Sequence, residues 1–152
     1  MEIREIKEDE MDKLLNLYSH LHPSDDPLPG IDAVNAVWHE IQTDPNIRYF
    51  GLFIDGELLS CCTICIIPNL TRGCRPFGII ENVVTHEDFR NRGYGKDVLG
   101  HALGYAWSRN CHNVMLQTSR KEEATLKFYE SAGFDRYRKQ AFVARPRKAS
   151  AI

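Results

Sequence analysis

The sequence has no excess of basic residues and no long apolar run. Its 152 residues include 19 Lys and Arg against 21 Asp and Glu, a formal net charge of −2. Nucleic-acid-binding proteins usually show a basic excess, so this charge balance argues against that class. No apolar run approaches the roughly 18 residues that a membrane-spanning helix needs, and Met1–Glu5 does not begin a signal peptide. We therefore expect a cytoplasmic protein that binds neither nucleic acid nor membranes.

The cysteines do not form a recognisable disulfide or zinc framework. There are five, an odd number, which fits a reducing compartment. Cys62 and Cys65 have the C-x-x-C spacing of zinc and redox sites, but they lie in an apolar run, Leu58–Ile67, that predicts a strand. Residues three apart in a strand point to opposite faces, and no second pair completes a zinc set. We expect these cysteines to pack in the core and no metal to bind.

The chain also lacks repeats, low-complexity tracts and linkers, which predicts one domain over 1–152 with a frayed tail at Pro146–Ile152. Hydrophobic periodicity predicts strands and helices in alternation. The predicted strands are Glu2–Ile6, Tyr49–Ile54, Glu57–Ile67, Gly78–Thr85 and Asn113–Thr118, followed by two short strands that end near Arg145. The predicted helices begin near Asp9, Asp32, Lys96 and Glu122. This order indicates an α/β domain in the broad sense, a mixed sheet with helices on its faces.

The stretch RNRGYGKD, residues 90–97, combines two glycines with three cations at the start of a predicted helix. It fails the P-loop pattern, and it fails the dinucleotide pattern because Val98 stands where a third glycine belongs. Free amides at a helix start can still cradle a diphosphate, and Arg90, Arg92 and Lys96 would add charge around it. The same residues also fit a tight turn with exposed cations, and spacing alone does not choose between the two.

Two motifs together resemble a known family. Arg90-x-x-Gly93-x-Gly95 resembles the acetyl-CoA pyrophosphate motif of the GNAT acetyltransferase superfamily, and the run from Phe128 through Tyr129 to Gly133-Phe134 resembles that family's second signature. The order of elements is similar from Glu2 to about Arg145. The resemblance implies a GNAT fold, α/β (α+β), with a mixed, mostly antiparallel sheet of about seven strands. That sheet would be splayed between strands 4 and 5 and flanked by about four helices.

One departure from the family is visible in the second half of the chain. Many members carry Asn seven residues before the signature tyrosine, and this chain has Glu122 there. Any contact that the family's Asn makes with the cofactor is therefore not expected here.

The resemblance also implies a cofactor site. Acetyl-CoA, as co-substrate and without a metal, would enter between the splayed strands and give its acetyl group directly to a primary amine of a small molecule or peptide. The main chain of Val83 and Thr85 would bond the pantetheine arm, and the Arg90 side chain would add charge beside the diphosphate. The pyrophosphate would rest on the amides of Arg92, Gly93, Tyr94, Gly95 and Lys96.

Tyr129 matches the family tyrosine that lies near the cofactor sulfur, which makes it the candidate general acid. The same residue also fits a simpler interpretation, as a packed aromatic beside Phe128 and Phe134.

Glu81 is the second candidate catalytic residue, because a carboxylate within an apolar strand is costly to bury without a purpose. Strict alternation would place Glu81, Val83 and Thr85 on one face, with the carboxylate over the point where acetyl group and amine meet. It would accept the amine proton or hold the ammonium. The alternative is a carboxylate that faces solvent or pairs with Arg72 or Arg75.

The sequence leaves the amine unnamed. Ile80–Asn82 and Lys127–Glu130 look most like the glucosamine-6-phosphate acetyltransferases within the superfamily, but the first half of the chain does not support that narrower assignment. The segment His22–Asp32, the loop Pro68–Phe77 and the C-terminal strands would select the substrate. A non-catalytic acetyl-CoA sensor or interaction module is the alternative, because cofactor residues alone do not make a catalyst. A homodimer is a family expectation.

Overall fold

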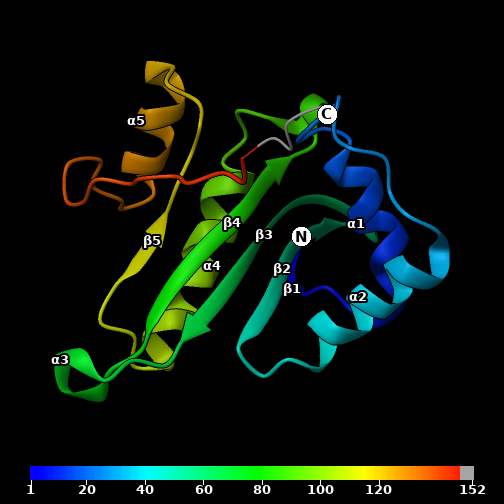
Figure 1. Cartoon of the computed structure of the whole chain (residues 1–152). Coiled ribbons are helices and arrows are strands. Elements are labelled where there is room, and N and C mark those ends of the chain that lie inside the picture. Colours follow the sequence, from blue (N-terminus) through cyan, green and yellow to red (C-terminus); the bar gives the residue numbers. More distant parts are fainter. Residues whose placement is uncertain (148–152) are drawn as a thin grey trace.

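The computed structural model describes residues 1–147; the rest of the predicted tail, 148–152, lies outside the described residues. The strands are β1 (Glu2–Glu5), β2 (Ile47–Ile54), β3 (Glu57–Ile67), β4 (Phe77–Thr85) and β5 (Val114–Leu116). The helices are α1 (Met11–Tyr18), α2 (Ile31–Thr43), α3 (Thr71–Cys74), α4 (Tyr94–Ser108) and α5 (Glu123–Ser131), with 3-10 turns at Glu8–Glu10 and Glu87–Phe89 (Figure 1). No helix within residues 1–147 is both long and apolar enough to cross a bilayer.

The strands form one sheet in the order β1-β2-β3-β4-β5. The first four pair antiparallel, and β5 joins β4 in parallel, so the predicted mixed, mostly antiparallel sheet is confirmed. The hairpin between β2 and β3 turns at Asp55 and Gly56, whose φ angles are 50° and 80°. Positive φ at both positions matches the twist of the flanking strands and explains why Asp-Gly is favoured there.

Helices cover both faces of the sheet (Figure 1). On the α4 face, Val98, Leu99 and Ala102 pack with strand residues that include Leu52 and Ile80. The opposite face, called here the α1–α2 face, holds a second cluster, formed by Ile6, Leu14, Leu17, Trp38, Phe53, Leu58, Cys61 and Val84. Because β3 is covered on both sides, it is buried over most of its length and its sequence is almost continuously apolar.

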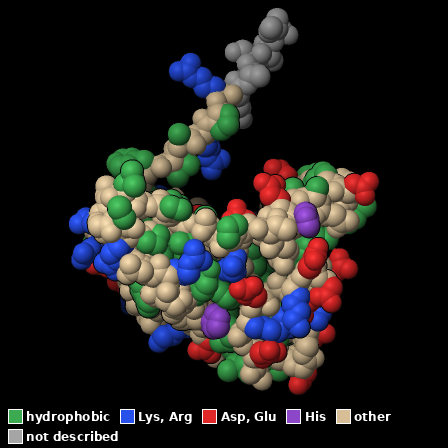
Figure 2. All heavy atoms as spheres, turned by 90° about the horizontal axis from the view of Figure 1, so that it is seen from below, with side chains coloured by type: hydrophobic (Ala, Val, Ile, Leu, Met, Phe, Trp, Pro, Cys, Tyr) green, Lys and Arg blue, Asp and Glu red, His purple; other side chains and the backbone are tan. Residues whose placement is uncertain are grey.

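Over residues 1–147 the structure has five strands and five helices, so the predicted seven strands and four helices are wrong. The two C-terminal strands are absent from the described chain: Phe134–Arg147 contains no strand, and Tyr137 and Phe142 are 84% and 89% exposed. Figure 2 shows the last described part of this segment projecting from the body of the molecule. An apolar alternating pattern becomes a strand only where a neighbouring strand completes its hydrogen bonds, and here the segment leaves the sheet.

The extra helix, α3, lies inside the predicted loop Pro68–Phe77. Arg72, Gly73 and Cys74 all have positive φ, between 55° and 68°. A short left-handed turn of this kind leaves no hydrophobic periodicity in the sequence, so pattern analysis could not find it.

An irregularity in β4 changes which residues share a face. Thr63 of β3 pairs with Glu81 of β4, and Cys61 pairs with Val84. Between these two pairs β3 has one residue and β4 has two, which is a β-bulge in β4. Asn82, within the bulge, has a φ of 52°. Glu81 follows Ile80 of the α4 face and therefore lies on the α1–α2 face, whereas Val83 packs on the α4 face. The predicted alternation of Glu81, Val83 and Thr85 on one face is wrong, because the bulge reverses it.

A buried ion pair fixes the first strand to the start of α1. Arg4 donates from Nη1 and Nη2 to the two carboxylate oxygens of Glu10, both at 2.8 Å, and the Lys7 amide donates to Glu10 at 2.9 Å. The side chain of Glu10 is 10% exposed. These bonds, the Arg4 pair first, lower the pKa of Glu10 from 4.5 to about 2.

We predict that Glu10→Gln lowers the free energy of unfolding by about 2 kcal/mol at neutral pH, because it removes charged hydrogen bonds from a buried site. A lowered carboxyl pKa stabilises the fold above the unfolded value and loses that effect as pH falls toward the folded value. The difference from wild type should therefore shrink between pH 4.5 and about 2. Urea unfolding across this range measures it, and a pH-independent difference would contradict it. Glu2→Gln, at the exposed partner of Arg4, is the matched control and should change stability by less than about 1 kcal/mol.

Candidate active site

The sheet opens between β4 and β5. Pairing runs from Gly78 with Val114 to Ile80 with Leu116, where β5 ends, while β4 continues to Thr85. The edge of β4 from Glu81 to Thr85 therefore has no β5 partner, so pairing between β4 and β5 ends where the predicted splay would begin. This region is called the β4–β5 opening. The unpaired backbone groups along this edge, those of Val83 among them, need partners from outside the sheet.

The glycine loop lies at the start of α4, beyond the end of β4. Gly93 is the residue before the helix and has a φ of 85°, a conformation that side chains with a Cβ rarely adopt. The first helical bond closes from the Asp97 amide to the Gly93 carbonyl at 3.0 Å. The amides of Tyr94, Gly95 and Lys96 precede it in the first turn, at the positive end of the helix dipole. This geometry can hold an anion.

Gly95 has a second role that the sequence did not reveal. A Cβ at this position would lie 3.0 Å from Cζ of Phe128 and 3.3 Å from Oγ1 of Thr85. The glycine therefore lets α4 pack closely against α5 and the end of β4. The spacing of the motif shows that Gly95 belongs to a turn, but not that two other elements press on it.

Arg90 joins two parts of the site. Its Nε donates to the carbonyl of Thr85 at 3.2 Å and its Nη2 to the carbonyl of His20 at 3.1 Å. The rings of His20 and His86 lie beside this contact, with centroids 4.0 Å apart. Arg90 thus ties the end of β4 to the residues that follow α1, a positioning role that the motif did not predict. Arg92 lies over the ring of Phe89, 5.1 Å from its centroid, and Lys96 is exposed.

Tyr129 comes from α5 and is partly buried. Its ring packs against Phe128 and Phe134, with centroids 5.0 and 6.4 Å away. Burial raises the pKa of the Tyr129 hydroxyl; Arg120 opposes this rise, and the charge of Glu81 adds to it. The hydroxyl is therefore protonated at neutral pH, as a proton donor must be, and it lies within electrostatic range of Glu81.

Glu81 is exposed on the α1–α2 face, opposite Thr63. Within residues 1–147 it forms no ion pair with any arginine. Arg75 instead donates to the carbonyls of Asn110 and Cys111. The arginine-paired alternative is therefore not observed. The bulge places Glu81 on one side of β4's free edge, while Tyr129 packs on the α4 face.

Glu122, which stands where many family members carry Asn, precedes α5. Its carbonyl accepts the amides of Thr125 and Leu126, and its side chain makes no capping bond. Arg136 pairs with Glu123, the first residue of α5, and with Glu130 near its end, and so bridges the two ends of the helix. These bonds fix the helix that carries Tyr129.

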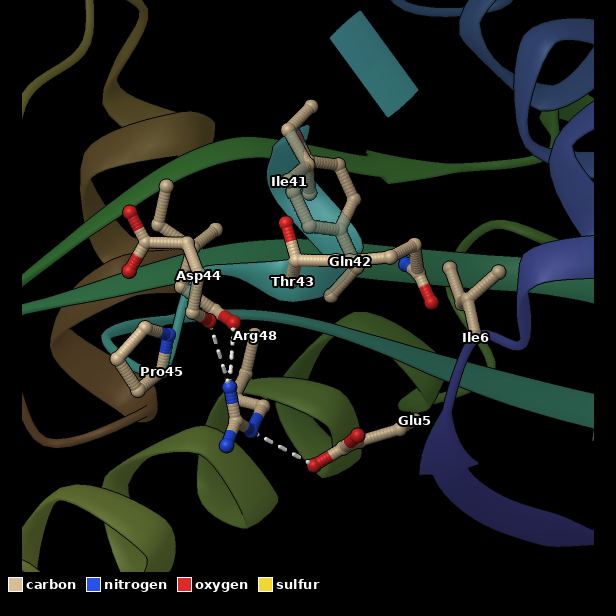
Figure 3. A pocket seen from close by; sticks show the side chains of 10 residues that line it. Glu5, Ile6, Ile41, Gln42, Thr43, Asp44, Pro45 and Arg48 are labelled. Carbon is tan, nitrogen blue, oxygen red and sulfur yellow. Dashed lines mark hydrogen bonds and ion pairs between the residues drawn. The ribbon is translucent and has the colours of Figure 1, made fainter. Parts of the chain in front are cut away.

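Two cavities lie elsewhere. One, of about 180 Å³, sits between the end of α2 and the start of β2 (Figure 3). In it Arg48 pairs with Glu5 at 2.9 Å and donates to the carbonyl of Asp44 at 3.1 Å, so its charge is already satisfied. The other, of about 360 Å³, lies beside α3 and is lined by residues that include Leu70 and Cys74. Neither contains Tyr129 or Glu81.

Comparisons with known proteins identify the family of this chain. The model of the acetyltransferase (GNAT) family matches residues 11–134. A glucosamine 6-phosphate N-acetyltransferase from Trypanosoma brucei brucei is 29% identical over 140 residues, 92% of each chain.

Two solved structures are similar over nearly the whole chain. One, described as a candidate acetyltransferase from Agrobacterium tumefaciens str. C58, is 40% identical with a TM-score of 0.90, covering 96% of this chain and 100% of its own. The other, a transcriptional regulator from Bacillus halodurans C-125, is 26% identical with a TM-score of 0.81. The match covers 95% of this chain and 99% of the regulator. The family match spans most of the chain and includes both motifs, so this chain belongs to the GNAT family of acetyl-CoA-dependent acyltransferases.

Proposed function

We propose that the chain moves the acetyl group of acetyl-CoA directly to a primary amine of a small molecule or peptide. The observation that carries this proposal is that Glu81 lies on the free edge of β4 and that its charge acts on the partly buried Tyr129. The glycine loop at the start of α4 lies next to the end of that edge.

The residues of the site fit acetyl-CoA, which supplies the acetyl group as an activated thioester. The backbone of Val83 and the amide of Thr85, whose carbonyl already accepts from Arg90, would bond the pantetheine arm as a neighbouring strand would. The amides from Arg92 to Lys96 would hold the diphosphate. Arg90, which bonds the carbonyls of Thr85 and His20, keeps its positive charge and would add electrostatic attraction.

The two catalytic candidates would divide the proton transfers. An exposed carboxylate at Glu81 attracts an ammonium and can take its proton, leaving the neutral amine that attacks a carbonyl. The Tyr129 hydroxyl, kept protonated by burial, would donate to the departing sulfur. Tyr129 belongs to the α4 side and Glu81 to the α1–α2 side, so acceptor and cofactor would meet between them.

The experiment that tests this function is a screen for CoA release from acetyl-CoA in the presence of amines. Because the Trypanosoma relative is a glucosamine 6-phosphate N-acetyltransferase, amino sugars and their 6-phosphates are the first amines to test. Polyamines, amino acids and peptide N-termini follow. Turnover with any of them would support the proposal and name the substrate class. Acetyl-CoA binding without release for every amine would favour the binding-module alternative.

We predict that Gly93→Val raises the Kd for acetyl-CoA at least about tenfold. A β-branched residue resists a φ of 85° and would place its side chain over the amides that hold the diphosphate. Calorimetry measures the affinity. Gly100→Val, in open space on the exposed side of α4, is the matched control and should bind like wild type. Equal affinity in a folded Gly93→Val protein would remove the loop from the cofactor site.

We predict that Glu81→Gln lowers kcat/KM for the amine by about 10²- to 10⁴-fold while acetyl-CoA affinity persists. The loss should shrink at high pH, where free amine is abundant. Steady-state rates across pH measure it, with Glu57→Gln, an exposed residue at the start of β3, as the control. Wild-type kcat/KM at neutral pH would reduce Glu81 to a surface residue.

We predict that Tyr129→Phe lowers kcat about 10²-fold and leaves fold and acetyl-CoA affinity within a few-fold of wild type. The ring that packs on Phe128 and Phe134 is kept, and only the proton donor is lost. Tyr137→Phe, at an 84% exposed position, is the control. An unchanged kcat, in an assay shown to be limited by chemistry, would leave Tyr129 as a packing residue.

A further inference from the structure

A row of polar side chains crosses the sheet beside Glu81. Tyr49 of β2 lies opposite Thr63 of β3, and Thr63 lies opposite Glu81 of β4. Side chains directly opposite in antiparallel strands share a face and are neighbours. Tyr18, the last residue of α1, packs over the same face, and the hydroxyls of Tyr18 and Tyr49 approach that of Thr63. Three hydroxyls thus gather next to the exposed carboxylate.

Two of these hydroxyls lack a well-aligned hydrogen bond. Tyr18 OH and Thr63 Oγ1 are buried and approach one another, but neither makes a hydrogen bond of good geometry within the described chain, and Thr63 is only 9% exposed. Other hydroxyls within the protein are paired: Ser60 bonds Thr85 at 2.8 Å, and Tyr105 accepts from Arg109 at 2.6 Å. Native proteins seldom leave buried hydroxyls without a partner, so these two hydroxyls are candidates for pairing with a bound ligand.

We propose that Tyr18, Thr63 and Glu81 form the acceptor subsite, and that the acceptor carries a hydroxyl or carbonyl oxygen next to its primary amine. This inference rests on the proposed acetyl transfer and names its substrate class. Glu81 holds the ammonium. The neighbouring oxygen of the acceptor pairs with the two hydroxyls, which both donate and accept. A simple alkylamine leaves them unpaired and is therefore disfavoured.

The elements around the subsite allow such an acceptor to enter. Glu81 is exposed at the β4–β5 opening, and Tyr18 stands at the very end of α1, where Ser19–Gly30 begins. Its ring is partly exposed while its oxygen points inward. A small movement of the Tyr18 ring would open its own hydroxyl and that of Thr63 to the acceptor. Burial raises the pKa of Tyr18 and Tyr49, so both phenols remain neutral hydrogen-bonding groups.

Thermal unfolding gives a test that needs no substrate. A hydroxyl that makes no well-aligned hydrogen bond in the free protein can be removed without loss, so Tyr18→Phe and Thr63→Val should leave Tm unchanged or raise it. Tyr105→Phe, which removes a bonded hydroxyl, is the matched control and should lower Tm by about 2–4 °C. A drop in Tyr18→Phe as large as in the control would show that its hydroxyl is structural and would overturn the inference.

Selectivity between matched amines tests the ligand class. Ethanolamine and propylamine have the same number of heavy atoms and differ by a hydroxyl, and wild type should favour ethanolamine in kcat/KM about tenfold. Tyr18→Phe and Thr63→Val should bring this ratio toward one, and Tyr105→Phe should not. An unchanged ratio in the two subsite variants would overturn the inference while leaving acetyl transfer intact. Absence of turnover with every amine would instead reject the proposed function. The Tm comparison would still show whether the hydroxyls of Tyr18 and Thr63 stabilise the free protein.

Discussion

The free edge of β4 is the constraint on which the rest of the site depends. Backbone N–H and C=O groups need partners, and beyond Ile80 the neighbouring strand no longer supplies them. The bulge at Asn82 adds a second effect at the same place, because it turns Glu81 toward the α1–α2 face while Val83 stays with the α4 core. Together the missing strand partner and the bulge create an edge that can bind an extended ligand. This edge has a carboxylate on one face and an apolar core on the other.

Close packing holds this edge in relation to the glycine loop. Gly95 brings α4 against Phe128 of α5 and Thr85 of β4, and Arg90 binds the carbonyl of the same Thr85. The glycine loop, the helix that carries Tyr129 and the end of β4 therefore meet at one residue. The second bond of Arg90, to His20, extends this frame to the segment after α1, where the proposed acceptor subsite begins.

Sequence patterns predicted the elements that are fixed by local periodicity and turn chemistry. β3, the Asp55-Gly56 hairpin and α4 lie within about two residues of their predicted places. The patterns failed where tertiary context decides. Phe142 and Val143 look like a strand but have no sheet edge beside them, the left-handed turn at Arg72 has no periodic signal, and strict alternation could not foresee a bulge at Asn82. In the site, both motifs predicted the glycine loop and Tyr129, whereas the bonds of Arg90 and the buried hydroxyl of Thr63 depend on long-range packing.

The central claim is that acetyl-CoA binds as a partner of β4 and the glycine loop. Residue-resolved amide hydrogen exchange, with and without saturating acetyl-CoA, tests it most directly. The account predicts slower exchange at Val83 and Thr85 and across Arg92–Lys96, with little change at the hairpin around Gly56. Binding that leaves these amides unprotected, or protection confined to another face of the sheet, would contradict it.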